Sequence, residues 1–128
     1  MKLLAWLKKF VEYRNSFKRE KLDIKEENNF LIVDNSKTLI KYLVFDDLSD
    51  LSVNLTTERV VCLNNKKNVD WLVNNWKKVC GGESFFLFVN PDTNEHWTIR
   101  PKHHDLVVED GELEKGLIAL MESIAIYE

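Results

Sequence analysis

The polar run at residues 64–68 (NNKKN) holds the side chains of this chain that are best suited to bind an anion. It follows an apolar run expected to be a central strand and precedes an expected helix. Ligands of open α/β sheets bind at such strand ends and helix N-termini. Lys66 and Lys67, together with the neighbouring amides, have the chemistry to hold a phosphate group. A polar loop that caps the helix is the alternative, and the absence of a glycine-rich cradle favours it.

The three histidines and two cysteines lack the spacing of a metal site or a nucleophile site. His103 and His104 are adjacent, so their side chains would point to opposite sides of an extended segment. No His-x-x-x-His, Cys-x-x-Cys or Gly-x-Ser-x-Gly pattern occurs. Cys62 and Cys80 are expected to be buried free thiols, as is typical of a reducing cytoplasm. We therefore expect no zinc site and no hydrolysis by a nucleophile.

The helix expected after the polar run has the clearest pattern in the chain. Its apolar residues recur at helical spacing from Val69 to Cys80 and form one stripe. Asn68 is the expected N-cap, because its side-chain oxygen can accept from a free backbone N–H. Gly81 and Gly82 supply the left-handed residue that ends a helix.

Two apolar runs flank this helix, Arg59–Leu63 and 84–89, and both are expected to be central strands. Strand, helix and strand then make a right-handed βαβ unit with parallel strands. A turn at 90–94 and a half-buried strand at 95–100 complete a hairpin, and Pro101 places that strand near an edge.

The N-terminal segments are expected to cover and extend this sheet. An amphipathic helix over roughly residues 2–19 comes first. Residues 21–25 and 30–33 form either one interrupted strand or a hairpin. Residues 38–45 form a further strand, with a helix over 37–48 as the competing interpretation.

The remaining segments complete the expected fold. Residues 46–57 form a long loop with room for one helical turn, and residues 102–105 are a polar connection. A closing helix has its apolar stripe between Leu113 and Ile124, with Asp110 as N-cap. The fold class is therefore α/β: residues 1–128 form a single domain with a mixed sheet, a central βαβ unit, a β-hairpin and helices on both faces. The expected order is α-β-β-β-α-β-β-α.

This order of elements resembles the core of the PD-(D/E)xK nuclease superfamily, which includes restriction endonucleases and Holliday-junction resolvases. In that family an acid and an acidic-x-Lys triplet gather a divalent metal and a water that attacks phosphate. The matching positions are Asp46 or Asp47 for the acid, and Asn64, Asn65 and Lys66 for the triplet. The resemblance implies Mg²⁺ or Mn²⁺ as cofactor. However, Asn64 stands where the family has a carboxylate, and a neutral amide binds Mg²⁺ poorly, so the resemblance implies a degenerate, non-catalytic relative.

Charge is distributed unevenly along a chain whose formal net charge is −3. The first 21 residues carry seven Lys or Arg against two Glu, whereas seven acids face one Lys from residue 105 onward. We expect the two terminal helices to attract one another within the chain, with head-to-tail association of copies as the alternative. A basic helix can also bind nucleic acid, here through Lys8, Lys9, Lys18 and Arg19, although a helix that covers the core is more common.

The function expected first is that of a small, non-enzymatic cytoplasmic module that binds another protein or its own copy through a sheet edge or a terminal helix. Trp71 or Trp97, if exposed, would anchor such an interface, and packing at the core edge is the alternative. The second expectation is nucleic-acid binding or metal-dependent nuclease activity through the basic helix, Lys66, Lys67 and an acid from Asp34, Asp46 or Asp47. No apolar run is long enough to span a membrane, so no membrane partner is expected.

Overall fold

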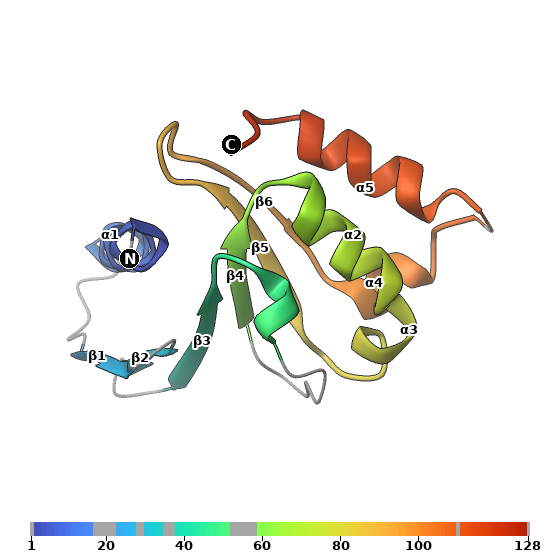
Figure 1. Cartoon of the computed structure of the whole chain (residues 1–128). Coiled ribbons are helices and arrows are strands. Elements are labelled where there is room, and N and C mark those ends of the chain that lie inside the picture. Colours follow the sequence, from blue (N-terminus) through green and yellow to red (C-terminus); the bar gives the residue numbers. More distant parts are fainter. Residues whose placement is uncertain are drawn as a thin grey trace.

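Six strands form one mixed sheet, in which each strand lies beside its neighbour in the sequence (Figure 1). β1, β2 and β3 are antiparallel, β3, β4 and β5 are parallel, and β6 returns antiparallel to β5. The computed structural model describes residues 2–16, 23–27, 30–34, 38–51, 59–109 and 111–127. The strands are β1 (Asp23–Glu27), β2 (Phe30–Asp34), β3 (Leu39–Phe45), β4 (Arg59–Leu63), β5 (Phe85–Asn90) and β6 (Glu95–Ile99).

Helices cover both faces of the sheet, and each face has its own hydrophobic core. On one face, α1 packs its buried Leu3, Leu7 and Val11 against strands β2 to β5. On the other face, α2, α3 and α5 pack around Phe86 and Phe88. The helices are α1 (Lys2–Ser16), the short 3₁₀ helix η1 (Leu48–Asp50), α2 (Lys66–Asn74), α3 (Trp76–Val79), α4 (Pro101–Asp105) and α5 (Leu113–Glu122). The expected α/β class with helices on both faces is confirmed.

The helix expected over residues 69–80 is two helices, and its expected N-cap is wrong. α2 begins one turn earlier, at Lys66, because the side chain of Asn65 accepts a hydrogen bond from the backbone N–H of Asn68. α2 ends at Asn74, and the side chain and backbone N–H of its C-cap Asn75 both donate to the carbonyl of Trp71. An Asn side chain that bonds the preceding turn competes with the regular helical ladder, which explains the break.

The N-terminal strands follow the expected pattern in most respects. β1 and β2 form a hairpin, which was one of the two alternatives. β3 is a strand paired on both sides, so the competing helix over 37–48 is wrong. The one helical turn expected in the loop after β3 is η1, whose N-cap Asp47 accepts from the backbone N–H of Ser49.

The C-terminal part of the chain differs from the expectation at two points. The polar connection after β6 is helix α4, since Pro101 occupies its first turn, where a missing N–H costs no hydrogen bond. The N-cap of α5 is Glu112, whereas Asp110 lies outside the described residues. No helix within the described ranges has both the length and the apolar character needed to cross a bilayer.

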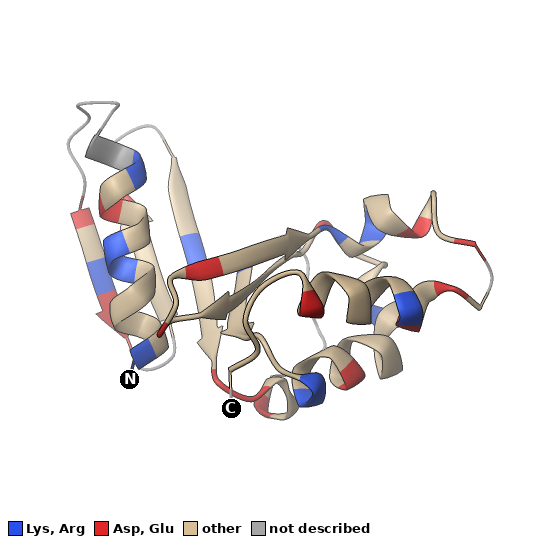
Figure 2. Cartoon of the chain, turned by 90° about the horizontal axis from the view of Figure 1, so that it is seen from above, with Lys and Arg blue, Asp and Glu red and all other residues tan. Residues whose placement is uncertain are grey.

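The expected attraction between the two terminal helices within one chain is wrong. α1 and α5 belong to the cores on opposite faces of the sheet, as Figure 2 shows from above. The cations of α1 pair with nearer acids: Lys2 with Asp92 in the β5–β6 turn at 2.7 Å, and Lys8 with Glu26 of β1. Sequence polarity therefore does not predict which elements meet, because the sheet separates them.

Candidate functional site

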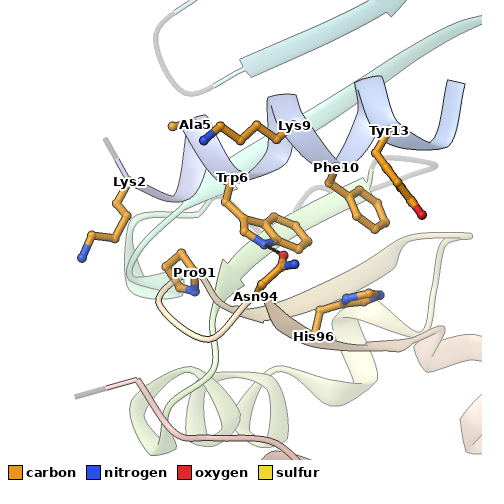
Figure 3. Close-up of a pocket in the computed structure, with 9 residues that line it drawn as sticks. All are labelled: Lys2, Ala5, Trp6, Lys9, Phe10, Tyr13, Pro91, Asn94 and His96. Atoms are coloured by element: carbon orange, nitrogen blue, oxygen red, sulfur yellow. Dashed lines mark hydrogen bonds between the residues drawn. The ribbon is translucent and has the colours of Figure 1, made fainter. Parts of the chain in front are cut away.

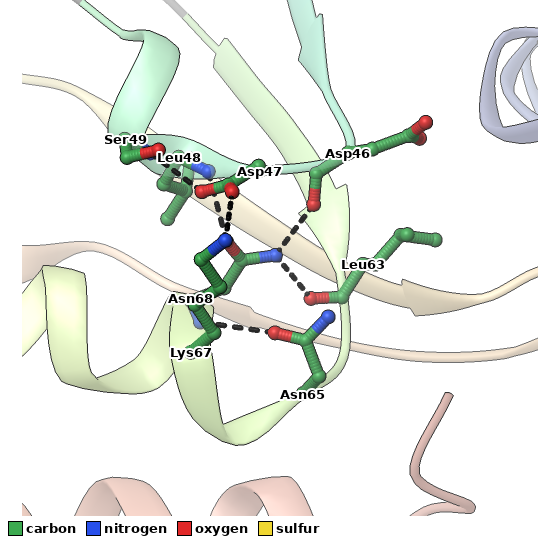
Figure 4. A network of polar contacts seen from close by, with 8 residues as sticks. All are labelled: Asp46, Asp47, Leu48, Ser49, Leu63, Asn65, Lys67 and Asn68. Carbon is green, nitrogen blue, oxygen red and sulfur yellow. Dashed lines mark hydrogen bonds and ion pairs between the residues drawn. The ribbon is translucent and has the colours of Figure 1, made fainter. Parts of the chain in front are cut away.

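The polar run at residues 64–68 is built into the structure rather than left open for a ligand. Asn68 is buried, and its side-chain oxygen accepts from the backbone N–H of Leu48 at 2.8 Å. Its amide nitrogen donates to the carbonyls of Asp46 and Leu63, each at 2.8 Å (Figure 4). Asn68 therefore fastens the loop after β3 to the end of β4, which is the arrangement expected of the polar-loop alternative.

The two lysines of the run have carboxylate partners. Lys66 pairs with Asp70 one turn along α2, and Lys67 pairs with Asp47 beside η1 (Figure 4). The pKa of Asp47 is lowered to about 2, first by the hydrogen bond from Lys67 and then by that from Ser49. Both ammonium groups are exposed, but each already has an anion beside it, so the pair makes a poor phosphate site.

Asn64 holds the C-terminal segment of the chain against the sheet. It is fully buried, and its amide nitrogen donates to the carbonyls of Met121 at 3.0 Å and Ala125 at 3.1 Å. Its side-chain oxygen accepts from the indole N–H of Trp97, and its backbone carbonyl accepts from the backbone N–H of Tyr127. The chain's own C-terminal residues therefore lie at the carboxyl end of β4, where ligands of open sheets commonly bind.

The four residues that the nuclease resemblance singles out do not fit a Mg²⁺ or Mn²⁺ site. Asn64 has its side-chain oxygen engaged by Trp97, and Lys66 and Asp47 have partners of their own. The side chain of Asp46 points away from the polar network in Figure 4. Within the described part of the chain, no three His, Cys, Asp or Glu side chains are grouped so that they could hold a metal ion. The topological resemblance itself stays a prediction.

The two tryptophans considered as interface anchors both pack against the core. Trp97 is buried and stacks on Phe88 with ring centroids 4.2 Å apart. Trp71 is half-buried, with its ring 6.3 Å from that of Phe86. Trp97 therefore has no surface to offer a partner, and packing at the core edge describes both side chains.

An open cleft lies where α1 leaves the outer part of its sheet face uncovered. α1 packs over β2 to β5, so the outward side chains of β6 on this face, His96 and Thr98, stay exposed. The cleft has a volume of about 740 Å³ (Figure 3). We call it the aromatic cleft, and its lining includes Lys2, Trp6, Lys9, Phe10, Tyr13, Asn94 and His96.

Rings from α1 and β6 meet in the aromatic cleft. Trp6 and Phe10 stack with centroids 4.9 Å apart, and the ring of His96 stands edge-on to Phe10 at 5.2 Å. Asn94 holds the wall in place, because its side-chain oxygen accepts from the indole N–H of Trp6 at 2.7 Å (Figure 3). Tyr13 is 67% exposed at the rim. The cleft thus presents aromatic surface to solvent between two rigid elements.

Positive charge accompanies these rings. Lys9 is exposed in the cleft, and the guanidinium of Arg14 lies 5.4 Å from the ring centre of Phe10. The pKa of His96 is lowered, mainly by burial and in addition by Arg14, so its imidazole is neutral at pH 7. Of the four cations proposed from the sequence, Lys9 lies in the cleft and Lys8 pairs with Glu26. Lys18 and Arg19 lie outside the described residues.

A second, polar hollow of about 500 Å³ borders the aromatic cleft. Tyr13 of α1 and His96 of β6 line the aromatic cleft. The second hollow is lined by Arg14, next to Tyr13 on α1, and by Thr98, two residues from His96 on β6. We call the second hollow the arginine pocket, and its lining includes Arg14, Arg59, Glu83, Phe85, Thr98, Arg100, Lys102 and His103. The two hollows are therefore neighbours, and we refer to them together as the groove along α1 and β6.

Sequence reasoning missed this groove, although part of its pattern is visible in the sequence. His96, Thr98 and Arg100 alternate along the return strand, and Trp6, Lys9 and Tyr13 recur at helical spacing on the second face of α1. The contributions of Arg59 and Phe85 depend on strand pairing, which no local pattern reveals. Comparison with protein-family models gave no match, and neither the curated proteins nor the solved structures contained a significant match to this chain.

Proposed function

We propose that this protein binds single-stranded nucleic acid in the groove along α1 and β6. The observation that carries the proposal is a pair of neighbouring hollows lined by exposed aromatic rings and by cations that have no carboxylate partner among the described residues. Proteins that bind single strands combine these two features, since bases stack on rings while a positively charged groove follows the phosphates. This is the second of the two functions expected from the sequence, but its support comes from other residues than Lys66 and Lys67.

The ring surface supports a preference for single strands over duplexes. Phe10 is half-buried and Tyr13 and His96 are exposed, so part of the ring surface of these residues is open to solvent and to an incoming base. A base inside a duplex has its faces covered by its neighbours, whereas a single strand can turn them outward. Stacking of one base on an aromatic side chain contributes about 1–3 kcal/mol.

The charge distribution supports an anionic ligand despite the net charge of −3. Lys9 lines the aromatic cleft, and Arg14, Arg59 and Arg100 line the neighbouring arginine pocket. None of these four has a carboxylate partner among the described residues, in contrast to Lys2, Lys8, Lys66 and Lys67. Because these cations have no carboxylate partner among the described residues, this surface favours the binding of a polyanion even though the protein has a net negative charge.

The proposal is tested by fluorescence anisotropy with labelled single-stranded and duplex oligonucleotides of one sequence at two salt concentrations. We expect tighter binding of the single strand, weakened by salt because phosphate contacts release counterions. Tyr13→Ser and Lys9→Gln should each weaken binding about three- to tenfold. Lys115→Gln, on α5 at the opposite face, is the matched control and should leave binding unchanged. Absence of binding at low salt, or equal effects of the Lys9 and Lys115 variants, would overturn the proposal.

Binding to another protein, the first function expected from the sequence, has a separate observation in its favour. Leu106 and Val107 directly follow α4 and are 82% and 78% exposed. Two adjacent large apolar side chains with this exposure favour self-association at this point. Under this second proposal, the protein should form dimers at high concentration by sedimentation velocity, and Leu106→Ser should shift it to the monomer. If the unaltered protein and the Leu106→Ser variant were both monomeric at every concentration, the self-association proposal would be wrong.

A further inference from the structure

From the arginine pocket we infer that the protein recognises a phosphorylated end of the strand, with the terminal phosphate held by Arg59 and Arg100. This inference rests on the proposed function and specifies its ligand. The pocket and the aromatic cleft are neighbours, because His96 and Thr98 are two residues apart on β6. Two residues of a strand span about 7 Å, so one bound nucleotide can reach both.

Two guanidinium groups are held against one ring in the pocket. The guanidinium carbon of Arg59 lies 5.8 Å from the ring centre of Phe85, and that of Arg100 lies 5.7 Å from the same ring centre. Arg59 also contacts the ring of Tyr42 at 5.8 Å and donates to its hydroxyl at 3.4 Å. The rings stabilise the two cations in place, but a ring carries no negative charge to offset their mutual repulsion. An incoming anion would supply it.

The acid of the pocket has other cations as its direct partners. Glu83 accepts a hydrogen bond from Lys102 at 2.7 Å and lies 3.8 Å from the imidazole of His103. The pKa of Glu83 is lowered, first by Lys102 and to a smaller extent by His103 and Arg100, so one carboxylate is shared among several cations of the pocket. Among the described residues, Arg14, Arg59 and Arg100 have no carboxylate partner. The pocket therefore keeps three guanidinium groups for a ligand.

A terminal phosphate fits this pocket better than an internal one. A phosphomonoester carries a charge of about −1.5 to −2 at pH 7 and three acceptor oxygens, whereas an internal diester carries one charge and has two such oxygens. Guanidinium groups bind phosphate through paired N–H donors. Lys102 and His103 of α4 also line the pocket, beside Arg100 in the sequence.

The inference is tested with internally labelled single strands of one sequence that end in 5′-phosphate, 3′-phosphate or hydroxyl groups. We expect one of the two phosphorylated strands to bind about tenfold more tightly than the hydroxyl-ended strand. Arg100→Gln should abolish that preference, so that the variant binds the phosphorylated and hydroxyl-ended strands with equal affinity, and more weakly than the unaltered protein binds either. Arg100 is exposed, so its replacement leaves both cores intact. Lys115→Gln is again the control, and Arg59→Lys should retain only part of the preference because lysine lacks the paired donors.

The outcomes separate the two proposals. Binding of all three strands with equal affinity would overturn the inference and leave the proposed function standing. Binding of none would overturn both. A mononucleotide that competes as well as the phosphorylated strand would identify a free nucleotide as the ligand, and would overturn the assignment to strand ends.

Discussion

The indole N–H of Trp97 donates a hydrogen bond of 2.8 Å to the side-chain oxygen of Asn64, and both side chains are buried. The same amide donates to the carbonyls of Met121 and Ala125. Asn64 thus connects β4, β6 and the C-terminal segment with both ends of one amide group. A carboxylate at this position could accept from Trp97 but could not donate to the two carbonyls. These hydrogen bonds therefore explain why an asparagine, and not an aspartate, suits residue 64.

Asn64→Asp should destabilise the fold by about 2–4 kcal/mol, because a buried carboxylate would face two carbonyl oxygens. Urea unfolding followed by tryptophan fluorescence measures the change. Trp97→Phe is the comparison, since it keeps a ring against Phe88 and loses one donor, with an expected cost of about 1–3 kcal/mol. A stable Asn64→Asp protein that cleaves DNA with Mn²⁺ would contradict this prediction and would favour the nuclease resemblance instead.

The contact between Trp6 and Asn94 should fix α1 to the β5–β6 turn. Asn94 has a left-handed backbone with φ of 60°, so Asn94→Ala should lose the hydrogen bond and gain backbone strain, about 1–3 kcal/mol in total. Asn94→Gly should cost less, because glycine adopts this conformation freely. A double-mutant cycle with Trp6→Phe should give a coupling of about 1 kcal/mol in the free energy of unfolding. A coupling near zero would show that the bond contributes nothing.

The ion pair between Asp47 and Lys67 should make stability depend on pH in acid. The pKa of Asp47 falls from 3.8 to about 2 on folding, so its contribution is complete above about pH 4 and is lost as pH falls towards 2. Asp47→Asn should cost about 0.5–1 kcal/mol at pH 7 and only a small part of that at pH 2, as measured from urea midpoints. Lys67→Gln should raise the pKa of Asp47, since Lys67 is its largest perturbing group. An equal cost of Asp47→Asn at both pH values would contradict the prediction.

His96 should titrate below the ordinary imidazole pKa of 6.5, because burial and the nearby Arg14 both disfavour its charged form. The lowered pKa means that the neutral form stabilises the fold above pH 6.5, and that this stability is lost as pH falls through the folded-state pKa. The ring-proton shifts in an NMR titration measure the value. Arg14→Gln should move the pKa of His96 upward but keep it under 6.5, since burial remains the larger cause. A pKa of 6.5 or above for His96 in the unaltered protein would contradict its partial burial beside Arg14 in the cleft.

The region from β4 to β6 was predicted best, because local sequence patterns indicate its elements. The apolar runs around Val60 and Phe86 and the stripe from Val69 to Val79 each indicate one element and the face that it buries. The break between α2 and α3 at Asn75 was not predicted, because it depends on a single side-chain hydrogen bond. Helix α4 was not predicted either, because five residues are too few to show a helical period.

The sequence by itself determined the α/β class, the parallel βαβ unit and the strands that flank it, because burial periodicity is a property of neighbouring residues. Only the tertiary structure decided which polar groups remain available. Lys66 and Lys67 form ion pairs with Asp70 and Asp47, and Asn64 is buried with its side-chain amide hydrogen-bonded. Conversely, strand register brings Arg59, Phe85 and Arg100, which are far apart in the sequence, to one pocket. Hydrogen bonds and ion pairs between distant segments carry no periodic signal, so the candidate site became visible only in three dimensions.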